Sequence, residues 1–151
     1  MSHAEIDGLL PDGRLTATDR DGRRIRLWGD ALPGERVVWD AAQGDGKRSH
    51  GRIVTVTRHH PERTSPTCPW VASCGGCDLA TWPPMLRQET LLDNVAALLH
   101  LPHRPAWHGS RKRTGYRARI TLRISGSRIG YHRARSNTLV EIGRCDVAQE
   151  K

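Results

Sequence analysis

Four cysteines are the residues of this sequence best suited to chemistry, and their spacing is typical of a metal site. Cys68, Cys74 and Cys77 stand close together, and Cys145 follows much later in the chain. Thiolates three positions apart can turn toward one centre, and the glycines at 75 and 76 let backbone N–H groups approach the sulfurs. On ligand count, four thiolates suit a [4Fe-4S] cluster and an all-cysteine zinc site equally well.

Other interpretations of the cysteines are weaker. Four unrelated buried thiols would not be expected to cluster beside a double glycine. A redox pair of the thioredoxin type needs a strand and a helix around it, and neither is predicted there. The eight histidines have no ligand spacing to the cysteines.

Composition indicates a folded chain with a thin core. The 151 residues include no Phe, and a small domain with few large apolar side chains usually needs a metal or disulfide to hold it together. No apolar stretch is long enough to span a membrane, and the N-terminus lacks the form of a signal peptide. We therefore expect a cytoplasmic protein, in which the thiols are reduced and available to a metal.

Positive charge is concentrated at one end of the chain. Residues 111–151 carry eleven Arg and Lys against three Asp and Glu, so the net charge of +8 lies there. A GC-rich genome would explain the preference for Arg over Lys, but it would not explain this asymmetry. The pattern favours a polyanionic partner, with RNA or DNA ahead of a membrane surface.

The elements that must position these residues are mostly strands. Residues 13–58 are predicted to form four or five short strands, with a hairpin turn at Asp21-Gly22, and the favoured shape is a small OB-like β-barrel. Residues 83–100 have a helical apolar period that we assign to core packing. Residues 115–145 return to strands, in which alternation places Tyr116 and the apolar residues on one face and the arginines on the other. The expected fold class is mainly β (α+β).

The motifs together resemble the SAM-dependent RNA (uracil-5-)-methyltransferases, in their bacterial 23S rRNA branch. Residues 68–79, Cys-Pro followed by Cys-Gly-Gly-Cys-Asp-Leu, are similar to the iron–sulfur motif of that family. Residues 31–35 resemble its N-terminal TRAM domain, and residues 140–145 resemble the strand that ends on the fourth cluster cysteine. One departure is Ala80-Thr81-Trp82, where the family commonly has Gln-His.

The resemblance implies a domain plan and a cofactor. Residues 1–60 would form a TRAM-like OB barrel, and residues 61–151 an iron–sulfur central subdomain with a Cys loop at 61–82, a helix at 83–100 and strands at 115–145. A [4Fe-4S] cluster would be held by Cys68, Cys74, Cys77 and Cys145. The sequence holds no Gly-rich SAM loop and no fifth cysteine to act as nucleophile, so we expect the SAM-binding catalytic domain to be absent from these residues. We expect the chain alone to be inactive, with no catalytic residue and SAM acting only through a missing domain.

The resemblance also implies an RNA-binding role, in which rRNA is favoured over tRNA. The alternatives are a zinc-stabilised nucleic-acid-binding module unrelated to methyl transfer and the RNA-recognition subunit of a split methyltransferase. The expected base-stacking residues are Tyr116 and Trp82. The expected phosphate contacts are Arg111, Lys112, Arg113, Arg117, Arg119 and Arg123.

Overall fold

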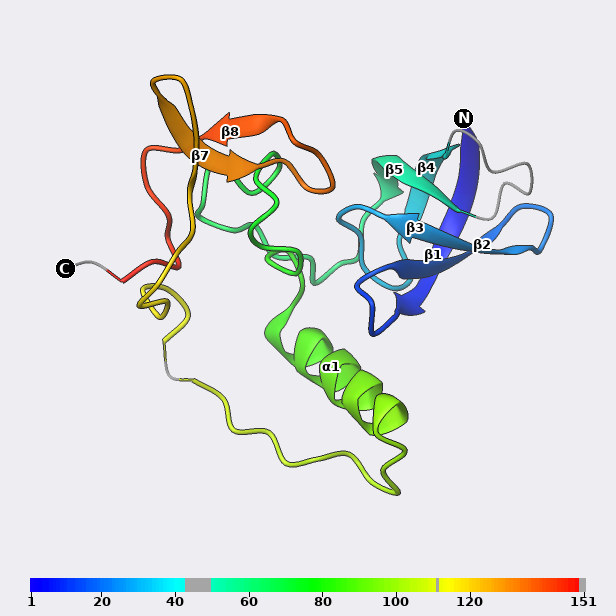
Figure 1. Cartoon of the computed structure of the whole chain (residues 1–151). Helices are drawn as coiled ribbons and strands as arrows, with labels where there is room; N and C mark the ends of the chain where they lie inside the picture. The colour runs from blue at the N-terminus through cyan, green and yellow to red at the C-terminus, as the bar shows by residue number, and fades with distance from the viewer. Residues whose placement is uncertain (43–49, 111, 150–151) are drawn as a thin grey trace. The chain divides into compact units, whose positions relative to one another are not determined.

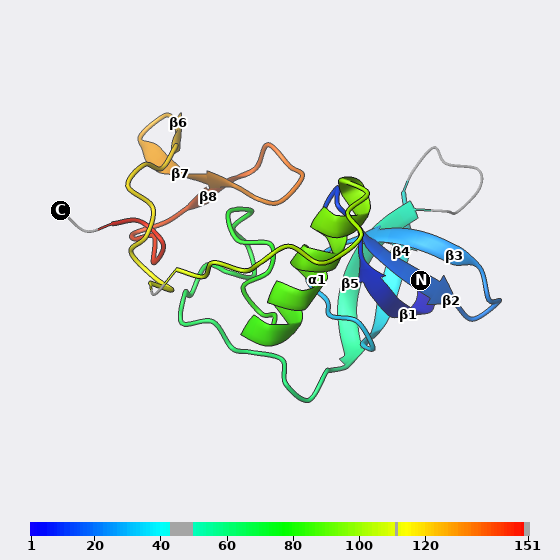
Figure 2. The same ribbon diagram turned by 90° about the horizontal axis from the view of Figure 1, so that it is seen from below.

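A computed structural model describes residues 1–42, 50–110 and 112–149 of the chain (Figures 1 and 2). The chain divides into two compact units. The barrel unit comprises residues 1–64 and 81–107, and the cysteine unit comprises residues 65–80 and 108–151.

The barrel unit begins with a closed β-barrel (Figure 1). Its strand order is β1-β2-β3-β5-β4, and every neighbouring pair is antiparallel except β3 with β5, which is parallel. The strands are β1 (Ser2–Leu9), β2 (Leu15–Asp19), β3 (Arg24–Trp28), β4 (Arg36–Ala41) and β5 (His50–Arg58).

Sequence alternation explains the barrel core. In β3, Ile25 and Leu27 are buried while Arg24 and Arg26 are exposed, as expected for a strand with one buried face. Gly22 has a φ of 75°, which the turn between β2 and β3 requires and which glycine adopts without strain. The expected barrel is therefore confirmed, although β1 was not predicted.

A buried ion pair fastens the chain after β5 to the barrel. The Glu35 carboxylate is fully buried and accepts hydrogen bonds from Arg63 Nη1 at 2.7 Å and from the backbone N–H of Leu32 at 2.8 Å. Arg63 also bonds to Asp30, which accepts a hydrogen bond from the Thr81 hydroxyl at 2.5 Å. These contacts hold both ends of the cysteine-bearing segment against the barrel unit.

The helix α1 (Pro84–Leu98) follows and contacts β1 (Figure 2). It begins at a proline, as predicted, because the first helical residue needs no N–H partner. The expectation that its apolar stripe packs into the core was wrong: α1 has no buried residue, and Val95 and Leu98 are exposed. The helix also belongs to the barrel unit, whereas the sequence grouped it with the cysteines. No helix in the described ranges is long and apolar enough to cross a membrane.

The cysteine unit contains a small antiparallel sheet in the order β6-β7-β8. The strands are β6 (Arg123–Ser125), β7 (Arg128–His132) and β8 (Leu139–Glu141). The strand predicted from residue 115 is shorter than expected, because Arg117 makes only one isolated bridge, to Ala148, and strand pairing begins at Arg123. The expected fold class is nonetheless confirmed: mainly β, with a barrel, one helix and an antiparallel sheet.

The cysteine unit has almost no apolar core. Among its described residues Gly130 alone is buried, and Ile124 and Ile129 are exposed. Every buried apolar side chain of the described chain lies in the barrel unit. Apolar burial therefore contributes little to holding the cysteine unit together.

Candidate functional site

The four cysteines all lie in the cysteine unit, as free and partly buried thiols. Burial raises the pKa of the Cys77 thiol, and the charges of Cys145, Cys74 and Cys68 act in the same direction. The Arg117 guanidinium opposes this shift. The fold thus brings Cys145 and Arg117 from the far end of the sequence into the electrostatic neighbourhood of Cys77.

Tight backbone turns shape the loop that carries three of the thiols. The N–H of Cys74 donates to the carbonyl of Trp70 at 2.7 Å. The N–H of Gly75 donates to the carbonyl of His132, at the end of β7, at 3.0 Å. A Cβ on Gly75 would lie 2.7 Å from the backbone N of Ala134 and 2.9 Å from the His132 oxygen. Residue 75 must therefore be glycine for the loop to reach β7 this closely.

The segment after β8 is tied to the same loop. Asp146, next to Cys145, accepts a hydrogen bond at 3.2 Å from the hydroxyl of Thr67, next to Cys68. Its carboxylate also lies 3.2 Å from Nε of Arg144. The backbone of Arg117 donates to Val147 at 2.8 Å and accepts from Gln149 at 2.9 Å. The Thr67–Asp146 bond thus joins the residues next to the first and last cysteines.

Tyr131 of β7 is a further part of the site, although no role is predicted for it from the sequence. Its hydroxyl oxygen lies 3.9 Å from the Cys145 sulfur. Burial, followed by the hydrogen bond with Cys145, raises the pKa of Tyr131 to about 12. Alternation along the strand was the one sequence signal for its position, because it places Tyr131 on the opposite face of the sheet from Arg128 and His132.

The four sulfurs are the right kind of donor for a metal or cluster bound by thiolates, but they do not surround one common metal position. Four cysteine thiolates are the ligands of many iron–sulfur and structural zinc sites, and nearby backbone N–H groups stabilise the charge on the sulfurs. Within the described parts of the chain, no group of three or more Cys, His, Asp or Glu side chains stands ready to hold a metal ion.

The predicted RNA-contact residues fall into two groups. Lys112, Arg113, Arg117, Arg119 and Arg123 are exposed in the cysteine unit, and Arg111 lies outside the described residues. Tyr116 is 47% exposed, with the Arg117 guanidinium 5.8 Å from its ring centroid. The prediction for Trp82 was wrong: the side chain is 2% exposed in the barrel unit, so its ring has no face open to a base.

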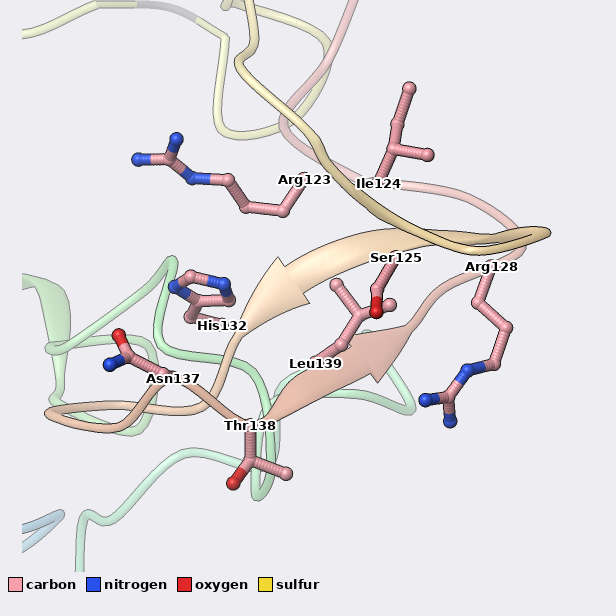
Figure 3. A pocket seen from close by; sticks show the side chains of 8 residues that line it. All are labelled: Arg123, Ile124, Ser125, Arg128, His132, Asn137, Thr138 and Leu139. Atoms are coloured by element: carbon pink, nitrogen blue, oxygen red, sulfur yellow. The ribbon is translucent and has the colours of Figure 1, made fainter.

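A pocket opens on the β6-β7-β8 sheet (Figure 3). It was not expected from the sequence, because its residues come from three strands and the loop before β8. The lining residues are Arg123, Ile124, Ser125, Arg128, His132, Asn137, Thr138 and Leu139.

Comparison with known proteins points to one group of enzymes. The chain is 30% identical to the 23S rRNA (uracil(1939)-C(5))-methyltransferase RlmD of Paraburkholderia xenovorans, over 89% of this chain and 31% of the relative. It is also 30% identical to the protein of the same name from Burkholderia thailandensis, over 95% of this chain and 34% of the relative. The chain therefore spans about a third of the length of these relatives. No family model matches it.

A solved structure has a similar fold. The crystal structure of Pyrococcus abyssi tRNA (uracil-54, C5)-methyltransferase in complex with S-adenosyl-L-homocysteine matches with a TM-score of 0.66 and 21% identity. The match covers 97% of this chain and 33% of that one. The resemblance to the RNA (uracil-5-)-methyltransferase family is thus confirmed, and nearly the whole chain corresponds to about one third of such an enzyme.

Proposed function

We propose that this chain is the RNA-binding, [4Fe-4S]-containing region of an RNA (uracil-5-)-methyltransferase. It would position rRNA for methylation by a SAM-binding domain that lies outside these 151 residues. In this proposal the barrel is a TRAM-like RNA-binding domain of residues 1–60, and the cysteine unit is the core of the central subdomain within 61–151. An rRNA partner and reduced thiols agree with a cytoplasmic location.

The contacts of Arg117 are the observation that carries the proposal. Its backbone bonds to Val147 and Gln149, just after Cys145, and its charge acts on Cys77. The neighbouring Tyr116 ring is half exposed, as base stacking requires. The basic segment and the thiols are thus parts of one small unit, so a group bound by the thiols would also order the surface offered to RNA.

The metal would be held by Cys68, Cys74, Cys77 and Cys145. Binding would require the four sulfurs to draw together, with the Tyr131 hydroxyl donating to the Cys145 thiolate and backbone N–H groups near Gly75 and Gly76 stabilising the sulfur charge. The contribution of the metal would be structural, because metal binding to a unit without an apolar core contributes directly to the folding of that unit. Zinc satisfies the same donors, and metal analysis separates the two.

The methyl group would come from SAM bound by a domain either fused to or encoded apart from this chain. A split enzyme is the second form of the same proposal. It is favoured if a reading frame for a SAM-binding domain lies beside this one in the genome.

Two measurements test the proposal. Anaerobic purification followed by visible absorption, iron and zinc analysis should give about four irons per chain, and zinc alone would replace the iron–sulfur assignment. Anisotropy with a 23S rRNA fragment that carries the uridine methylated by the relatives should give binding that weakens with salt.

A charge variant locates the RNA surface. Changing Lys112, Arg113 and Arg119 to Gln should flatten the slope of log affinity against log salt by about two units, at ~0.7 per lost phosphate contact on single strands. The matched control changes Arg20, Arg24 and Arg26, which are exposed on the barrel, and should flatten the slope less. If the slope of the first variant is unchanged, the cysteine unit is not part of the RNA-binding surface.

A further inference from the structure

The β6-β7-β8 sheet has two faces with different surroundings. Strand alternation and register place Arg123, Arg128 and His132 on one face, while Tyr131 lies on the other. The Tyr131 face reaches Cys145, at 3.9 Å. The face with the arginines carries the pocket of Figure 3, so the pocket and the cysteine site use opposite sides of one sheet.

Gly130 gives this pocket an open floor. It lies between Arg128 and His132 on β7 and pairs with Arg123 on β6 and Glu141 on β8. A Cβ at position 130 would lie 1.9 Å from the carbonyl oxygen of Val140, so the position admits no side chain. The middle of this face therefore carries no side chain, whereas the positions around it carry longer ones.

The charged side chains that line the pocket are cationic. Arg123 and Arg128 are exposed and extend from two ends of the pocket (Figure 3), and neither forms an ion pair with any residue that the structure describes. Glu141 shares the face by register but does not line the pocket. No Asp or Glu stands in the sequence between Asp93 and Glu141, so the surroundings carry no other acidic side chain from this segment.

The polar rim is held in place by its own loop. The Ser136 hydroxyl donates to Thr138 Oγ1 at 2.9 Å and accepts from the Thr138 N–H at 3.0 Å. The N–H of Arg133 donates to the carbonyl of Thr138 at 2.9 Å. The amide of Asn137 and the hydroxyl of Thr138 are thereby presented at the pocket edge, where they can bond to a ligand.

We propose that this pocket binds one nucleotide of single-stranded RNA. Arg123 and Arg128 would each contact one of the two phosphates that flank the nucleoside, and the nucleoside would lie over Gly130. His132, Asn137 and Thr138 would bond to its ribose and base edge. The two arginines match the phosphates, which form charge-assisted hydrogen bonds with guanidinium groups. The uncovered surface at Gly130 and the polar side chains beside it match an unstacked base, which needs open area and hydrogen-bond partners. The proposal rests on the RNA-binding function proposed above.

The test uses the full chain and two probes. Uridine 3′,5′-bisphosphate, a nucleoside with both flanking phosphates, is titrated while the NMR signals of the His132 ring and the Asn137 amide are followed. A fluorescent ten-residue oligouridylate is titrated by anisotropy over a salt series. Arg123→Gln/Arg128→Gln is compared with Arg133→Gln/Arg135→Gln, which removes two exposed charges from the same unit outside the pocket.

The expected result separates the two pairs. The bisphosphate should shift both signals in the parent and in the control pair, and the shifts should fall at least tenfold in the pocket pair. The pocket pair should also flatten the oligouridylate salt slope by about 1.4, from two lost contacts at ~0.7 each. Asn137→Ala keeps every charge and should weaken bisphosphate binding without changing that slope.

Two outcomes would overturn the proposal, and they are distinguishable. If the parent binds oligouridylate but the bisphosphate leaves His132 and Asn137 unshifted, or shifts them equally in the pocket pair, the pocket is not a nucleotide site and the RNA-binding function stands. If the parent binds neither probe nor the rRNA fragment, both proposals fail.

Discussion

The guanidinium of Arg63 lies 2.7 Å from the carboxylate of Glu35, in a pair of which the acid is fully buried. Glu35 stands just before β4, and Arg63 follows β5 in the segment that leads to the cysteines. The backbone N–H of His60 also donates to Glu35, at 3.0 Å. One carboxylate thus fixes both the turn before β4 and the exit of the chain from the barrel.

Arg63→Ala should destabilise the barrel unit by about 3–5 kcal/mol, because it leaves the Glu35 carboxylate buried without its cation. Denaturant unfolding, followed by fluorescence of the barrel tryptophans, measures the change. The control is Arg104→Ala, whose ion pair with Asp93 is exposed on both sides and should cost no more than ~1 kcal/mol. Equal losses in the two variants would contradict the role assigned to the buried pair.

Gly75→Ala should disrupt the cysteine loop, since the added methyl group would press on the backbone at Ala134 and His132. We expect a lower metal content and faster amide exchange at residue 75, whose N–H bond to His132 would be lost. Gly143→Ala is the matched control, because a Cβ there meets nothing within 4 Å. A Gly75→Ala protein with the metal content of the control would show that the close approach is dispensable.

Cys145→Ser should release the metal and unfold the cysteine unit, although the change lies close to the C-terminus. The described part of that unit has no buried apolar side chain to compensate. A loss of only ~2 kcal/mol lowers the melting temperature of a small domain by about 10 °C. The barrel signals should persist, since its core contains none of the thiols. Full iron or zinc content in this variant would disprove the four-cysteine assignment.

SAM should not stabilise this chain, and the chain should transfer no methyl group to unmodified rRNA or tRNA. A ligand present at about a hundred times its Kd would stabilise the folded state by about 2.7 kcal/mol, which a melting curve detects readily. Tritium incorporation from labelled SAM provides the second measurement. A clear melting shift would reveal a cofactor site within these residues.

Local patterns were enough to predict the barrel and the limits of the helix. Alternation in β3 and the Asp21-Gly22 turn are properties of adjacent residues, so they are readable without the fold. β1 was missed because only Ala4 and Ile6 of its residues are buried, which is a short signal for a strand that pairs with both β2 and β4.

Other features depended on contacts between distant residues. The alternation at 116–122 resembles a strand, but in the structure Arg117 bonds to Val147 and Gln149, and strand pairing begins only at Arg123. Trp82 is buried because the Arg63, Asp30 and Thr81 bonds draw its segment onto the barrel unit. The position of Tyr131 beside Cys145 likewise required the strand order β6-β7-β8.

The backbone N–H of Thr64 donates to the carbonyl of Thr81 at 2.8 Å, so the segment between them leaves and rejoins the barrel unit at one point. Such a segment is an insertion with its ends already closed, and a host fold is little affected by the length of such a loop, at roughly 0.6 kcal/mol for each doubling. Three of the four thiols lie on this insertion. A single deletion between Thr64 and Thr81 would therefore remove three of the four thiols at once while the ends of the segment stay joined on the barrel unit, and the reverse insertion would supply them together. If the thiols hold the metal proposed above, one genetic event would be enough to lose or gain most of its ligands.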